Sequence, residues 1–143
     1  MSDLVERVVA LKGVDIFSTL PYPLLAELAE LVTESTFAPG AVIIAEGDLD
    51  QDLYALTSGE VVVTSSSAAD VTLSAGTVFG ELAVLNPGPR SATVTAVGEA
   101  TMLVLSRPTL LALTDRHPAV MAEIARVLAE RLQSSSGSTT PRR

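Results

Sequence analysis

The sequence contains no cysteine and a single histidine among its 143 residues. The lack of thiols excludes disulfide bonds, thiolate zinc sites and a cysteine nucleophile. One histidine, His117, cannot supply the two or three imidazoles of a metal-dependent jelly-roll enzyme, and no nucleophile-elbow motif surrounds any serine. We therefore predict no enzyme activity, no catalytic residues and no bound metal, and we interpret His117 as a surface or helix-terminal residue.

Long hydrophobic runs are also lacking, although the mean hydropathy is +0.42. A helix that spans a bilayer needs about 20 consecutive apolar residues. The densest apolar stretches here, residues 41–45 and 102–105, are interrupted after a few positions, and the N-terminus has no basic region followed by an apolar one. The sequence predicts a cytoplasmic protein that makes no contact with a membrane.

Basic residues are few: nine Lys and Arg face 17 Asp and Glu, which gives a formal charge of −8. A field of that sign opposes contact with nucleic acid or anionic lipid. The terminal pair Arg142–Arg143 is too small a basic patch to change this, and no recognition helix follows the last predicted helix. We predict no nucleic-acid partner, and any anionic ligand must be held by a local device.

Helical periodicity is present at both ends of the chain. Apolar residues cluster in 4–11, and from Pro21 onward Leu24, Leu25, Leu28 and Leu31 repeat at helical spacing. A short helix over 109–114 and a longer one over 118–132 are predicted after residue 106. Apolar stripes of this kind are typical of helices that pack on a core or on a partner helix.

The middle of the chain changes to short β-branched runs separated by glycine-containing turns. The clearest runs are 42–44, 53–56, 61–64, 71–73, 92–97 and 101–105. This pattern predicts an α+β, mainly β fold: an eight-stranded antiparallel jelly roll or β-roll, flanked by N-terminal helices and two C-terminal helices. Residues 1–133 are predicted to form one domain, and the Ser/Thr/Gly-rich residues 134–143 a disordered tail or linker remnant.

One segment, residues 79–94, interrupts the strand pattern with a glycine, a short helical turn, a tight loop and an isolated arginine. Gly80 permits a backbone conformation that a Cβ would strain, and a helix N-terminus favours an anion. Arg90 presents a planar fork of donors that suits a phosphate, and Glu81 can accept a hydrogen bond from a sugar hydroxyl. A Glu81–Arg90 ion pair that merely staples the loop is an equally good interpretation of this spacing.

The sequence Phe-Gly-Glu-Leu-Ala at 79–83, followed by Pro-Arg-Ser-Ala-Thr-Val at 89–94, resembles the phosphate-binding cassette of cyclic nucleotide-binding domains. This family includes protein kinase A regulatory subunits, catabolite activator proteins and nucleotide-gated channels. The resemblance also covers residues 16–20, 37–44, 46–48 and 53–61, and it extends over most of residues 14–132.

The resemblance implies that Arg90 binds the cyclic phosphate and that Glu81 binds the ribose 2′-hydroxyl. It also implies that Gly80, Leu82 and Ala83 shape the cassette, with the backbone of Leu82 and Ala83 donating to the ligand.

Further ligand contacts follow from the same resemblance. Ser91 resembles bacterial cAMP-binding members, in which the hydroxyl after the arginine reaches the phosphate, and Ala92 belongs to the same ligand-binding stretch. In some members a residue of the last helix closes over the purine, and Arg131 or Leu128 falls near that position. A solvated Arg131 and a core Leu128 are the alternatives.

The resemblance implies a regulatory domain that binds cAMP and couples binding to a movement of its C-terminal helix. The ligand is a cyclic nucleotide rather than a cofactor; cGMP is the alternative to cAMP, although the Thr common in cGMP-selective members is replaced by Ser91. A second alternative is an orphan fold that serves as a protein-interaction module, although such members typically lose the Glu or the Arg. A fused or associated effector domain is expected, and a homodimer stays open.

Overall fold

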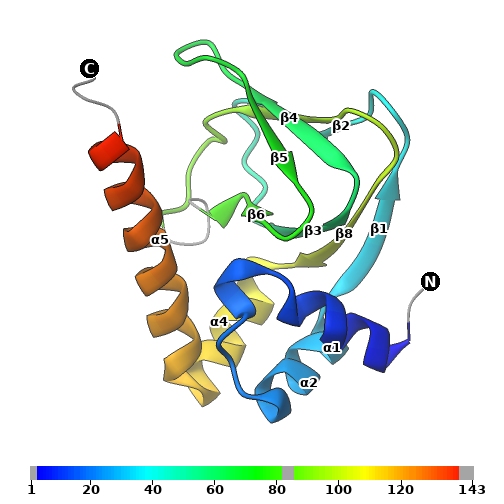
Figure 1. Ribbon diagram of the computed structural model, residues 1–143, viewed down its shortest axis with the longest axis vertical. Coiled ribbons are helices and arrows are strands. Elements are labelled where there is room, and N and C mark those ends of the chain that lie inside the picture. Colours follow the sequence, from blue (N-terminus) through cyan, green and yellow to red (C-terminus); the bar gives the residue numbers. More distant parts are fainter. Residues whose placement is uncertain (1–2, 82–85, 139–143) are drawn as a thin grey trace.

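The computed structural model describes residues 3–81 and 86–138 and has the predicted architecture, a β-roll flanked by helices from both ends of the chain (Figure 1). The helices are α1 (Leu4–Lys12), the 3-10 turn η1 (Asp15–Phe17), α2 (Tyr22–Leu31), α4 (Arg107–Arg116) and α5 (Pro118–Ser138). The strands are β1 (Thr33–Phe37), β2 (Val42–Ile44), β3 (Leu53–Ser58), β4 (Glu60–Thr64), β5 (Val71–Ser74), β6 (Val78–Phe79), β7 (Thr93–Ala96) and β8 (Ala100–Leu105).

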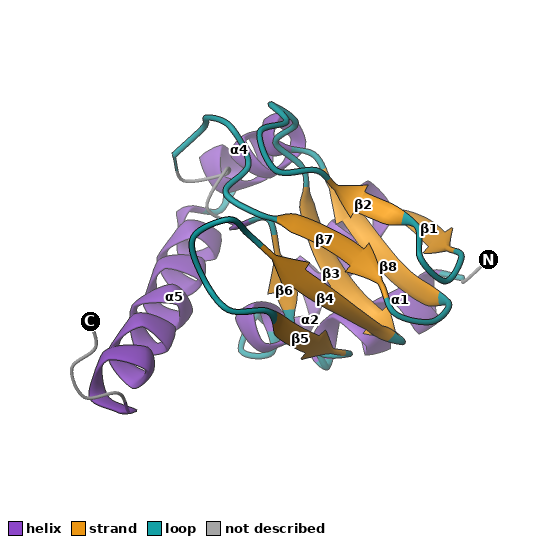
Figure 2. Cartoon of the chain, turned by 90° about the horizontal axis from the view of Figure 1, so that it is seen from above, coloured by secondary structure: helices purple, strands orange, loops and turns teal. Residues whose placement is uncertain are grey.

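The eight strands form two four-stranded sheets in which every neighbouring pair is antiparallel. One sheet has the order β1-β8-β3-β6 and the other β2-β7-β4-β5. Figure 2 shows the two sheets facing each other, with α5 projecting away to one side. The fold class predicted from the sequence is confirmed.

Two of the strands, β1 and β6, show no hydrophobic period in the sequence. Strand β1 has the polar sequence TESTF, and it lies at a sheet edge where it pairs with β8 from Thr33 opposite Val104 to Phe37 opposite Ala100. Strand β6 has only two residues, too few to show any alternation, and it is fixed by its pairing with Tyr54 and Ala55. Both strands depend on partners distant in sequence.

The C-terminal helices are longer than the hydrophobic pattern predicts. Helix α4 begins just after Ser106, whose hydroxyl accepts a hydrogen bond from the amide of Thr109 at 3.3 Å. Helix α5 runs beyond the predicted end at Leu132 to Ser138. A helix that is already formed gains one backbone hydrogen bond for each residue added, so it can extend beyond the apolar stripe that the sequence shows. Within the described residues, no helix is long and apolar enough to cross a bilayer.

The buried side chains form two hydrophobic cores, which lie on opposite faces of a wall formed by β3 and β8. The first core joins the helices to one face of the first sheet, and the second fills the inside of the roll. Strand β3 contributes Leu53 and Ala55 to the helical core, and Tyr54 and Leu56 to the core of the roll. Strand β8 alternates in the same way. The two strands therefore have both faces buried.

Candidate functional site

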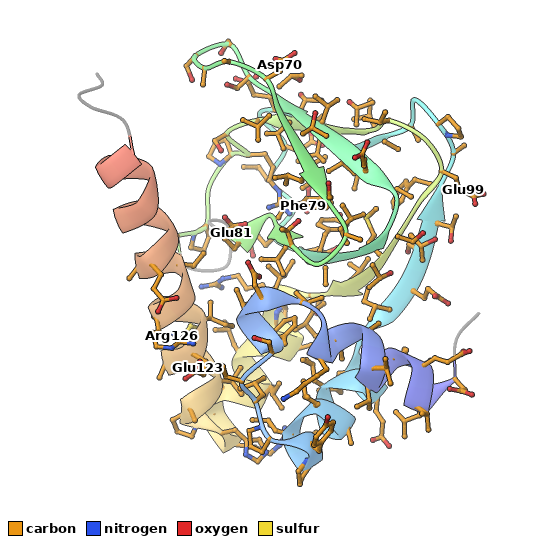
Figure 3. The ribbon with its side chains drawn as sticks, viewed as in Figure 1. Asp70, Phe79, Glu81, Glu99, Glu123 and Arg126 are labelled. Carbon is orange, nitrogen blue, oxygen red and sulfur yellow. The ribbon has the colours of Figure 1, made fainter. Side chains whose placement is uncertain are left out.

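A cavity of about 550 Å³ is lined mainly by residues of the roll, and its volume is within the size range of small-molecule sites. Its apolar wall comes from the strands, and its polar side chains come mainly from the segment after β6. Five of the residues predicted as ligand-binding line it together: Gly80, Glu81, Arg90, Ser91 and Ala92. In Figure 3, Glu81 lies at the end of β6, between the roll and α5, and Phe79 precedes it. The topology therefore brings the two ends of the predicted cassette to one cavity.

Arg90 is the only charged or polar residue classed as buried in the described part of the chain, and its exposed fraction is 6%. Its backbone is held by the loop after β2: its amide donates to the carbonyl of Asp48 at 2.7 Å, and its carbonyl accepts from the amide of Gly47 at 2.8 Å. A buried guanidinium is stable only when its charge is paired and its N–H groups have acceptors. The surroundings of Arg90 meet both requirements.

The acceptors of the Arg90 guanidinium come from two segments. The carboxylate of Asp50 accepts a hydrogen bond from Nε at 3.2 Å and a second hydrogen bond from Nη2. The Asp52 carbonyl accepts from Nη2 at 2.7 Å, and the Gly80 carbonyl accepts from Nη1 at 3.1 Å. Four of the five N–H groups thus have acceptors among the described residues. Arg90 joins the loop after β2 to the start of the cassette.

Gly80 is required at its position on two independent grounds. Its φ is +83°, a left-handed conformation that side chains other than glycine rarely adopt. A Cβ built on Gly80 would lie 2.8 Å from Nη1 of Arg90 and 2.8 Å from the carbonyl oxygen of Asp52. The glycine predicted from the motif therefore makes room for the buried arginine.

The carboxylates near Arg90 have opposite pKa shifts. Burial alone would raise the pKa of Asp50, but hydrogen bonds from Arg90 and the Asp52 amide, with the charge of Arg90, hold it below its ordinary value. Burial and the charge of Asp50 raise the pKa of Asp52. Burial and both carboxylates raise the pKa of Tyr54 to about 12, and its ring stacks on Phe79 with centroids 5.0 Å apart. Arg90 is thus embedded in an acidic environment.

The other predicted ligand contacts lie elsewhere. Leu82 and Ala83 are outside the described residues, as is the side chain of Arg131. Leu128 belongs to the helical core, with an exposed fraction of 9%, and it does not line the cavity. This burial agrees with the alternative interpretation of Leu128 as a core leucine.

Two residues that matter for the site were missed from the sequence. Asp50 and Asp52 lie in the acidic run Asp-Leu-Asp-Gln-Asp at 48–52, which is indistinguishable from a solvated loop. Only the tertiary contact with Arg90, 40 residues away for Asp50, gives them a role. Asp15, from η1, also lines the cavity.

A buried, glycine-accommodated arginine and a neighbouring glutamate in a β-roll cavity define a ligand-binding domain suited to a small anion with hydroxyls. The cyclic nucleotide-binding domain family model matches residues 34–117, more than half of the chain. The chain belongs to this family, a family of regulatory ligand-binding domains, so the resemblance identified from the sequence is confirmed.

Individual relatives agree. The chain is 42% identical over 88 residues to a cAMP-dependent protein kinase regulatory subunit of Yarrowia lipolytica, covering 60% of this chain and 24% of the relative. It resembles the N-terminal domain of a Streptomyces coelicolor transcriptional regulator with a TM-score of 0.74, 30% identity and coverage of 90% and 94%. It resembles the regulatory domain of Toxoplasma gondii PKA crystallised with cAMP, with a TM-score of 0.78, 27% identity and coverage of 89% and 50%. The chain spans about a quarter of the first of these relatives.

Proposed function

We propose that this chain is a sensor domain that binds cAMP in the cavity and passes the binding event to α5. The observation that carries the proposal is that Gly80, Glu81, Arg90 and Ser91 line one cavity. In this proposal Arg90 and the Ser91 hydroxyl bind the cyclic phosphate, Glu81 accepts the ribose 2′-hydroxyl, and the apolar wall receives the purine. The cAMP-bound neighbour supports a cyclic nucleotide as the ligand.

The remaining parts of the proposal concern the context of the domain. Residues 1–133 would form the sensor and residues 134–143 a linker toward an effector, fused or associated, in the cytoplasm. No group of three or more metal-ligating side chains occurs among the described residues. The only histidine, His117, contacts Glu27 and is not among the residues that line the cavity.

The test is calorimetric titration with cAMP, cGMP and 2′-deoxy-cAMP. Arg90→Ala should weaken cAMP binding by more than about tenfold, because charge-assisted hydrogen bonds contribute roughly 1.5–3 kcal/mol. Arg126→Ala removes an exposed arginine of α5 and is the matched control. Since Arg90→Ala also strips Asp50 of its partner, folding of the variant is verified by circular dichroism.

Glu81→Ala provides a second arm that leaves Arg90 and Asp50 themselves unchanged. It should weaken cAMP binding and leave 2′-deoxy-cAMP binding almost unchanged, because only cAMP has the hydroxyl to lose. Equal losses for both ligands would assign Glu81 a purely structural role. Tighter binding of cGMP than of cAMP would identify cGMP as the ligand in place of cAMP. If neither nucleotide binds, the result would favour the alternative of a protein-interaction module.

A further inference from the structure

The corner between α4 and α5 is formed by one residue, His117. Its backbone has φ −136° and ψ 79°, outside the helical region, and Pro118 begins the next helix. Its amide donates to the carbonyl of Leu113 at 2.8 Å, and its carbonyl accepts from the amide of Val120 at 2.9 Å. In Figure 1 the two helices meet at this corner, below the roll. Any change in the angle of α5 relative to α4 must be taken up here.

A single carboxylate from another element binds both sides of this corner. Glu27, on α2, accepts at Oε2 from Nε of Arg116 at 3.0 Å and from Nη2 of the same side chain. Its other oxygen, Oε1, lies 2.9 Å from Nε2 of His117. The last residue of α4 and the corner residue are therefore bound to one side chain, roughly 90 residues earlier in the chain.

We infer that Glu27 is a positioning residue that clamps the α4–α5 corner, and that the charge of His117 tunes the clamp. This inference rests on the proposed function, because its consequence for ligand affinity requires that α5 moves when the nucleotide binds. We refer to the Glu27–Arg116–His117 cluster as the corner clamp.

Charged groups from three helices surround His117 within the clamp. Glu27 faces it from α2, Arg116 and the exposed Asp115 are its neighbours on α4, and on α5 the carboxylate of Glu123 is engaged by Arg126 and Thr19. Figure 3 shows Glu123 and Arg126 side by side on α5. Hydrogen bonds from Arg116 and His117 lower the pKa of Glu27, so this carboxylate stays charged in mild acid.

The clamp acts in a definite direction. None of the α5 side chains described between Pro118 and Glu130 lines the cavity, and in the proposed function the arrangement held by the clamp is the open one. A clamp that stabilises this arrangement opposes closure of α5 and lowers apparent affinity. Histidine changes charge between pH 5 and 8, and its positive form pairs with Glu27. Acidification should therefore tighten the clamp, and a rise in pH should release it.

The absence of cysteine allows a distance measurement with two introduced thiols, Glu99→Cys on the turn before β8 and Ala129→Cys on exposed α5. Spin labels at these sites should give a distance distribution that broadens from pH 5.5 to 8.0 without nucleotide. Glu27→Gln should show the broad distribution at both pH values, and His117→Gln should lose the pH dependence. Glu30→Gln, an exposed glutamate on the same helix, is the matched control.

Titration with cAMP at pH 6 tests the functional consequence. Glu27→Gln should bind about two- to fivefold more tightly than Glu30→Gln, the range that exposed ion pairs allow. Identical distances and affinities for these two variants would overturn the clamp. If no variant binds cyclic nucleotide, the proposed function fails, while the distance measurement still decides whether the clamp exists. A fall in the melting temperature of Glu27→Gln without any change in distance would also contradict it, since Glu27 would then be merely stabilising.

Discussion

Arg90 has two roles in the proposed function, because it lines the cavity as the cation for the phosphate and it is also the partner of Asp50. The Asp50 carboxylate fixes the guanidinium plane through two bonds and compensates its charge in a buried position. An incoming phosphate would be a second anion at the same group. The pairing thus orients Arg90 in advance, and it opposes any anion that cannot provide comparably good hydrogen bonds.

This pairing predicts a pH-dependent stability. The folded-state pKa of Asp50 is below its ordinary value, so its contribution is fully present above that ordinary value and is lost as pH falls through the folded-state pKa. Asp50→Asn should therefore lower the free energy of unfolding at pH 7 by about 1–2 kcal/mol, a charge-assisted bond discounted for solvent access. The deficit should shrink on acidification toward pH 3, as measured by urea denaturation.

Asp48→Asn is the control, because Asp48 lies in the same loop with its side chain exposed and contributes only its backbone carbonyl to Arg90. A deficit of equal size in both variants, or one that grows in acid, would contradict the proposed role of the Asp50 carboxylate.

At the residue scale, the sequence predicts the local part of the site. Gly80, Glu81, Arg90 and Ser91 stand in one motif, and all four line the cavity. The contact between this arginine and the loop after β2 could not be predicted. The local sequence around Asp50 and Asp52 does not distinguish them from acidic residues in a solvated loop. Their effect on Arg90 arises only when the loop after β2 is brought against the cassette.

At the scale of elements, the contact of η1 with α5 links the N-terminal segment to the last helix. Phe17 and Leu20 share the helical core with Val120 and Ile124, and the Thr19 hydroxyl donates to Glu123. Since Asp15 of the same turn lines the cavity, η1 contacts both the cavity and α5. Its apolar contacts hold the base of α5 in place.

Ile124→Ala should therefore lower the free energy of unfolding by about 2–4 kcal/mol, because Ile124 is 2% exposed and a cavity would remain. Val9→Ala truncates another β-branched helical residue that is 67% exposed, and it should stay within about 0.5 kcal/mol of the original chain. Chemical denaturation followed by circular dichroism measures both. Equal effects would mean that α5 is not anchored through this contact.

The helices and long strands were predicted because each has its own hydrophobic period. Strand β1, which has a polar sequence, and the two-residue β6 were not predicted, because they are fixed by pairing with a partner strand and not by a hydrophobic period of their own. The end of α5 was also misjudged, since the apolar stripe stops before the helix does.

At the scale of the whole molecule, the net charge of −8 acts against an anionic ligand before any contact is made. The screening length falls from about 30 Å at 0.01 M salt to about 8 Å at 0.15 M. The association rate of a fluorescent cyclic nucleotide should therefore rise over this range, opposite to electrostatically steered binding. Stopped-flow measurement of both rate constants tests this, with dissociation expected to change less. An association rate that falls with salt would show that the local field of Arg90 dominates the approach.

The wall formed by β3 and β8 has a consequence for cooperativity. Because alternate residues of the same two strands belong to the two cores, the helices cannot detach without exposing one apolar face of the strands that close the roll. The roll likewise cannot open without removing the surface on which the helices pack. The helical layer and the roll around the cavity should therefore melt together as one unit, so a ligand that stabilises the roll also stabilises the helices packed on the other face of β3 and β8.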